Sequence, residues 1–229
     1  MKVSLFAAVA AVLFLSLMSG CSGDPRVARQ SVAPPAEVDL TAADADAAAK
    51  LGELVERAKG DPENATFRGE LGMAYSVNGY QLAAMTSYEQ AAELDPTNPR
   101  WKYLLALARS KSGDLEGALA AIDESIALDP SYVSSHLHRG FWLLDQGDAG
   151  VEAEQAFQTV LELDPDNRAG LLGLARSMFR QGRNPEVIEM LEAATVERPG
   201  DAYLFHLLGT AYRFANEEEK ASVALAKGK

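Results

Sequence analysis

An apolar helical stretch closed by Asp-Pro decides the fold, as in AAELDP at residues 91–96 and LELDP at residues 161–165. The motif recurs at intervals of 34, 34 and 35 residues, and an Arg-Pro follows 34 residues later. The five dipeptides are Asp61-Pro62, Asp95-Pro96, Asp129-Pro130, Asp164-Pro165 and Arg198-Pro199. Because proline lacks the N–H that a helix interior needs, each one ends a helix and allows the next to begin. A period of this length predicts an array of short helix pairs.

Fixed positions inside the period carry fixed residue types when the closing proline is counted as position 32. Small residues stand at position 8: Gly72, Ala106, Gly140, Ala175 and Gly209. Large apolar residues stand at position 24: Tyr88, Ile122, Phe157, Leu191 and Leu225. This pattern resembles the tetratricopeptide repeat (TPR), in which position 8 of one helix meets the second helix closely. The resemblance implies an all-α fold, a right-handed TPR superhelix of stacked helix-turn-helix pairs.

The resemblance also divides the chain into units. Residues 41–64 are expected to form an N-terminal capping helix, since Leu51, Leu54, Val55 and Ala58 fall on one apolar stripe. The units expected to follow are TPR 1 at 65–98, TPR 2 at 99–132, TPR 3 at 133–167, TPR 4 at 168–201 and a partial TPR 5 at 202–229.

The first twenty residues are apolar after Lys2 and predict a signal peptide at residues 1–20. They run into Leu17-Met18-Ser19-Gly20-Cys21, which resembles the bacterial lipoprotein signal. The resemblance implies a lipid on Cys21, the single cysteine of the chain, and a membrane anchor through it. The alternatives are cleavage without lipidation and an uncleaved anchor. Residues 21–40 contain three prolines and are expected to form the lipidated cysteine and a flexible, disordered tether, with a rigid stalk as the alternative.

Composition excludes several classes of function. The formal net charge is −12, whereas a nucleic-acid binder needs an excess of lysine and arginine. A single cysteine rules out a disulfide framework and a Cys-based zinc finger. The three histidines, His136, His138 and His206, form no HExxH motif, and the sequence contains no GxSxG motif. We therefore expect no nucleic acid partner, no metal, no cofactor and no catalytic site: the chain is not expected to be an enzyme.

By family resemblance, positions 2, 5, 9 and 12 of the first helix in each unit face an inner groove. Their spacing of three and four places them on one stripe, which is mostly apolar in this chain. We expect the groove to bind an amphipathic helix or extended segment of a protein partner, with arginines near its C-terminal end pairing acidic residues. The alternative is a stripe buried by the array or by the tether folding back. The expected groove residues are Met73, Tyr103, Leu107, Leu137, Phe141, Leu144, Leu172, Arg176, Phe179, Arg180, Tyr203, His206 and Arg213.

The layout of lipoprotein signal, tether and TPR units resembles the pilotin-like assembly lipoproteins of type IV and Tad (Flp) pilus systems. It implies a lipid-anchored scaffold at the periplasmic face of the outer membrane, where the groove would hold a segment of a secretin. Ser22 supports the outer membrane, because by resemblance an aspartate after the cysteine favours the inner one. The alternatives are an adaptor that organises peptidoglycan synthases or hydrolases and a structural component of a secretion or export system.

Overall fold

The computed structural model describes residues 32–41, 43–147 and 150–228. The predicted signal peptide, Cys21 and most of the predicted tether lie outside these residues. The helices belong to one compact unit, Ala33–Lys229. Over the ranges just given, no helix has both the length and the apolar content to cross a membrane.

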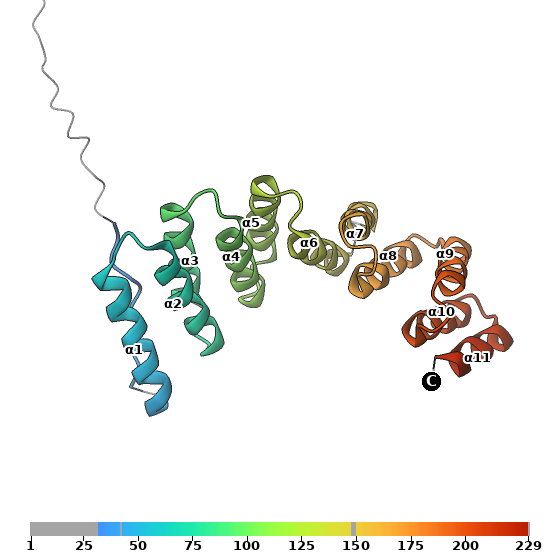
Figure 1. The fold of residues 1–229 in the computed structure, drawn as a ribbon, viewed down its shortest axis with the longest axis horizontal. Coiled ribbons are helices and arrows are strands. Elements are labelled where there is room, and N and C mark those ends of the chain that lie inside the picture. Colours follow the sequence, from blue (N-terminus) through green and yellow to red (C-terminus); the bar gives the residue numbers. More distant parts are fainter. Residues whose placement is uncertain (1–31, 42, 148–149, 229) are drawn as a thin grey trace, which may run out of the picture. The chain divides into compact units, whose positions relative to one another are not determined.

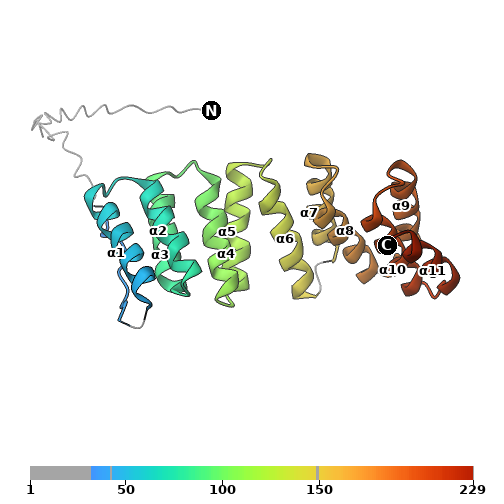
Figure 2. The ribbon, with the colours of Figure 1, turned by 60° about the horizontal axis from the view of Figure 1, so that its bottom comes forward.

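The described residues form helices joined by short turns. Helix α1, Ala45–Gly60, comes first, and five pairs follow it in chain order (Figures 1 and 2). The pairs are α2 (Ala65–Val77) with α3 (Gln81–Leu94), α4 (Pro99–Lys111) with α5 (Leu115–Leu128), α6 (Val133–Gln146) with α7 (Gly150–Leu163), α8 (Arg168–Arg180) with α9 (Asn184–Glu197), and α10 (Ala202–Phe214) with α11 (Glu218–Lys227). The predicted all-α fold of helix-turn-helix repeats is confirmed.

The Asp-Pro dipeptide is one half of a recurrent turn, and an asparagine three residues after the aspartate is the other half. Asp95 Oδ2 accepts a hydrogen bond from Asn98 Nδ2 at 2.9 Å, and Asn98 Oδ1 caps α4 by accepting from the N–H of Arg100 at 3.1 Å. The same aspartate–asparagine bond joins Asp61 to Asn64 and Asp164 to Asn167. Capping satisfies N–H groups that have no partner within the helix, so this turn starts α2, α4 and α8 at a defined residue.

Contact between positions 8 and 24 holds each pair together, as the sequence predicts. A Cβ atom added to Gly72 would lie 2.7 Å from the ring of Tyr88, and one added to Gly209 would lie 2.6 Å from Leu225. Within a pair, the turn needs a left-handed residue: Gly147 has φ of 98°, and Asn216 takes the same role in the last pair with φ of 61°.

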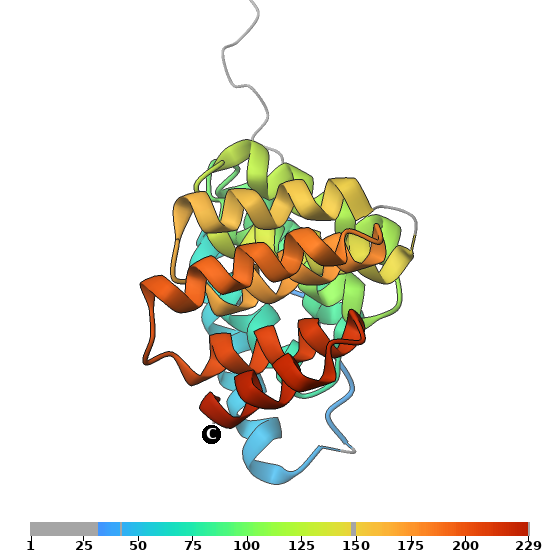
Figure 3. The same ribbon diagram turned by 90° about the vertical axis from the view of Figure 1, so that its right-hand side faces the viewer.

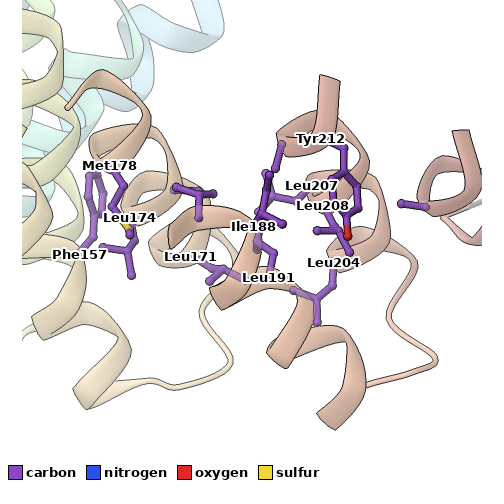
Figure 4. Packing of buried hydrophobic residues seen from close by; sticks show 14 of the residues in the cluster. Phe157, Leu171, Leu174, Met178, Ile188, Leu191, Leu204, Leu207, Leu208 and Tyr212 are labelled. Atoms are coloured by element: carbon purple, nitrogen blue, oxygen red, sulfur yellow. The ribbon is translucent and has the colours of Figure 1, made fainter. Parts of the chain in front are cut away.

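Two large clusters of buried apolar side chains run through the unit. One extends from α1 to α6 and the other from α6 to α11. Figure 4 shows part of the second, where Ile188 and Leu191 of α9 lie beside Leu204 and Leu207 of α10. Neighbouring helices are therefore joined in series, each pair packing on the next.

The region before α2 differs from the expectation. Helix α1 buries the four residues of its predicted stripe. However, residues 33–40, assigned from the sequence to the flexible tether, lie against the folded unit, where Ala36, Val38 and Leu40 pack on the first cluster. We call residues 33–40 the strap. The tether prediction therefore extends too far toward the C-terminus, because the apolar side chains of the strap are covered by α1, α2 and their neighbours.

Candidate functional site on the first helices

The first helix of each pair (α2, α4, α6, α8 and α10) carries the expected groove residues. Eight of their apolar side chains are half-buried, and each packs on one of the two core clusters. We call these eight the first-helix row: Met73, Tyr103, Leu107, Leu137, Phe141, Leu172, Phe179 and Tyr203. Each of these side chains leaves one part accessible while another part contacts the core.

Leu144 does not belong to this surface. Its side chain is 1% exposed and lies in the second core cluster with Ala153 and Phe157. Position 12 of α6 therefore faces the second helix of its own pair, and the expectation that Leu144 lines the groove is wrong. The neighbouring Phe141 stays half-buried and meets the ring of Phe157 edge-on, with 4.9 Å between the ring centroids.

An aromatic cluster in the middle of the row includes residues that the sequence pattern did not select. Tyr103 of α4 lies 5.2 Å from Tyr132 and 5.5 Å from His138, measured between ring centroids. His138 lies 5.6 Å from Trp142 in the same way. Burial raises the pKa of the Tyr103 hydroxyl above its ordinary value. The signal in the sequence was the spacing of His138 and Trp142, four residues apart on one helix face.

The C-terminal end of the row combines apolar and cationic groups. Phe179 of α8 and Phe214 of α10 lie with ring centroids 5.1 Å apart, so the C-terminal ends of these helices are adjacent. Phe214 is 63% exposed and was missed because it falls one position beyond the expected stripe. Arg180 donates to the carbonyl oxygen of Leu144 through Nη1.

The other polar residues of the expected groove are exposed. Arg176, Arg213 and His206 lie on the surface. Neither Arg176 nor Arg213 makes an ion pair with another described residue. Phe179, Phe214 and these two arginines form what we call the C-terminal patch. Among the described residues, no group of three or more His, Cys, Asp or Glu side chains is placed to hold a metal ion. The arrangement is suited to contact with a protein segment that is apolar on one side and acidic on another.

Comparison with known proteins identifies the repeat. One model described as tetratricopeptide repeat matches residues 143–211, and a second with the same description matches residues 45–99 and 79–133. Together they cover more than half of the chain. No curated protein sequence matches it.

Solved structures show the same fold at low sequence identity. A tetratricopeptide repeat protein from Parabacteroides merdae has a TM-score of 0.64 and 20% identity, over 80% of this chain and 72% of that chain. YrrB, described as a TPR protein with an unusual peptide-binding site, has a TM-score of 0.61 and 18% identity, over 76% of this chain and 90% of its own. The first TPR of Spaghetti bound to an HSP90 peptide has a TM-score of 0.50 and 24% identity, over 53% of this chain and 96% of its own. The chain therefore belongs to the tetratricopeptide-repeat superfamily.

Proposed function

We propose that this chain is a lipid-anchored scaffold at the periplasmic face of the outer membrane, where it assists assembly of a pilus or secretion complex by holding a segment of a secretin. Its tetratricopeptide repeats make it a protein–protein interaction scaffold, and proteins of this superfamily are in general not enzymes. The finer assignment goes further and is supported by two separate features of the chain.

The feature that carries the binding proposal is the first-helix row together with the C-terminal patch. Half-buried apolar side chains are already held in place by the core, so a partner gains contact area without the cost of ordering flexible side chains. Arg176 and Arg213 would pair with acidic residues of the bound segment. Two structural neighbours support peptide binding by this fold: YrrB has an unusual peptide-binding site, and the first TPR of Spaghetti holds an HSP90 peptide.

The feature that supports the location is the segment Leu17-Met18-Ser19-Gly20-Cys21, which lies outside the described residues. Lipid on Cys21 would keep an acidic protein at a membrane surface whose anionic lipids repel it. The predicted tether would then set how far the repeats reach from the membrane.

The test is photo-crosslinking in intact cells from a probe at Phe214, with mass spectrometry of the trapped protein. A probe at Val151 of α7, which is 55% exposed, serves as the matched control on a second helix. A secretin trapped from position 214 and absent at position 151 is the expected result. Several cell-wall enzymes at position 214 would instead establish the adaptor. The same proteins at both positions, or none at 214, would refute the binding surface.

A further inference from the structure

The strap shows how this chain recognises an extended segment. Side chains of α2 and α3 donate to three of its backbone carbonyl oxygens: Arg68 Nη2 to Ala33 at 2.9 Å, Gln90 Nε2 to Pro34 at 2.8 Å and Tyr75 Oη to Ala36 at 2.6 Å. From α1, Lys59 pairs with Glu37 of the strap at 2.8 Å. The strap therefore lies between α1 and α3 on the surface of α2, in what we call the N-terminal groove. Contacts to carbonyl oxygens leave the identity of most bound side chains free.

A second groove lies at the other end of the repeats, between α9 and α11 and over α10. Figure 3 looks onto this end of the unit. The groove encloses about 600 Å³, and Phe205, Leu208 and Tyr212 of α10 form its floor. Val196 of α9 and Val223 of α11 stand at its sides and are 80% and 60% exposed. We call it the C-terminal groove.

The two grooves use the same positions of the repeat. A shift of 137 residues relates positions 4, 7 and 11 of α2 to those of α10: Arg68 corresponds to Phe205, Leu71 to Leu208 and Tyr75 to Tyr212. The same shift converts Gln90 into Lys227 and Lys59 into Val196, which also line the C-terminal groove. Each groove thus has a tyrosine at position 11, where Tyr75 binds a carbonyl oxygen of the strap.

Charged pairs occupy these positions in the second unit. Lys102 and Arg109 of α4 stand at positions 4 and 11, and they bridge to Glu124 at 2.5 Å and to Glu89 at 3.1 Å. These bridges join α4 to the second helices on either side of it. A segment lying along α4 would have to displace them, whereas the floor of the C-terminal groove presents Phe205 and Leu208, and its charged residues, Glu192, Glu219, Lys220 and Lys227, come from α9 and α11.

We infer that the C-terminal groove binds an extended, proline-containing, apolar segment of a partner protein in the manner in which the N-terminal groove binds the strap. Tyr212 donates its hydroxyl to Glu192 in the structure, and on binding it would turn to a backbone carbonyl of the segment. Val196 stands where Lys59 pairs with Glu37, so the bound segment carries an apolar residue at that place instead of an acidic one. This site lies on other residues than the first-helix row and would act independently of it.

The test uses a synthetic peptide with the sequence of residues 32–41 and the change Glu37→Leu, labelled with a fluorophore and carrying a photo-crosslinking group. Binding to the purified full chain is followed by fluorescence anisotropy. The variant Val223→Glu should weaken binding at least tenfold, because it places a charge against an apolar segment. Val151→Glu, a change of the same kind at a similarly exposed site, should leave binding unchanged. Tyr212→Phe should weaken it about fivefold through the lost donor.

The other outcomes overturn the inference. Binding that Val223→Glu leaves intact, or crosslinks confined to α1 and α3, would mean that the peptide merely exchanges with the strap. No binding at all would refute a peptide site. If Val223→Glu instead dissociates a dimer in sedimentation experiments, the groove is an interface between two copies of this chain. The peptide without the Glu37→Leu change should bind more weakly to the C-terminal groove, and equal affinity of the two peptides would contradict the role given to Val196.

Discussion

The packing of Phe157 makes a sharp prediction for the variant Gly173→Ala. A Cβ atom at Gly173 of α8 would lie 2.1 Å from Cε1 of Phe157, and one at Gly140 of α6 would lie 2.7 Å from Cζ of the same ring. The ring is fully buried. It is therefore held between the backbones of two neighbouring first helices, and it has no open side into which it could move.

Two opposing effects set the size of the change. Replacing glycine by alanine inside a helix favours folding by about 1 kcal/mol. Forcing an extra methyl group into a packed core costs about 1–3 kcal/mol. Because 2.1 Å is far below an ordinary van der Waals contact of 3.4–4 Å, we place the cost at the upper end. The expected net destabilisation of Gly173→Ala is about 1–2 kcal/mol.

The matched control is Gly52→Ala in α1, where nothing lies within 4 Å of the added Cβ atom. This variant should gain about 0.5–1 kcal/mol from helix propensity alone. Denaturant unfolding followed by circular dichroism gives both midpoints. Adding Phe157→Leu to Gly173→Ala should recover part of the loss by reopening the space. A midpoint for Gly173→Ala at or above that of the wild-type chain would refute the proposed packing between units.

Four further predictions follow from individual side chains. Tyr75→Phe removes a donor to the strap, so limited proteolysis within residues 33–40 should speed up about tenfold, while cleavage within α6 stays unchanged. Cys21→Ser should release the chain from the membrane fraction in cell fractionation; retention there would refute the lipid anchor. Phe214→Glu should abolish capture of the proposed partner with an unaltered circular dichroism spectrum, whereas unaltered capture would exclude the C-terminal patch. Burial raises the pKa of Tyr88 to about 12, above the value of about 10 in the unfolded chain, so its contribution to stability is lost as the pH rises from about 10 to 12. Thermal unfolding of Tyr88→Phe should then depend less on pH in that window, and an equal dependence would contradict it.

The repeat itself was predictable from sequence because its determinants are local. Asp95, Pro96 and Asn98 build a turn within four residues, so its recurrence is visible along the chain. The small residue at position 8 and the large one at position 24 lie in one helix pair, and their contact follows from their spacing. The apolar stripe of α1 was equally predictable, because a helix that covers one face of a repeat repeats its apolar residues about every 3.6 positions along the sequence.

The binding surfaces were less predictable, because they depend on contacts between distant segments. Leu144 falls at the boundary between the inner face of α6 and the side that meets α7, and helical spacing alone does not separate the two. The strap reads as a tether because it contains two adjacent prolines and because its alternating apolar residues, Ala36, Val38 and Leu40, span only five positions. Its main polar contacts are made by carbonyl oxygens, which every residue possesses and composition therefore does not reveal.

Positions 4, 7 and 11 of the first helices explain how one repeat produces different surfaces. The turn and the contact between positions 8 and 24 fix the backbone of each unit, so the residues at positions 4, 7 and 11 are free to vary without loss of the fold. In the second unit positions 4 and 11 carry charges that bridge neighbouring helices. In the first unit positions 4 and 11 hold the strap, which leaves Nε and Nη1 of Arg68 buried without a hydrogen-bond partner. In the last unit all three positions form the floor of an open groove. The two unpaired nitrogens of Arg68 weaken the contact between α2 and the strap, because buried donors without acceptors offset part of the binding energy. The two end units thus differ from the second unit, because groups that accept an extended chain stand in place of its charged bridges.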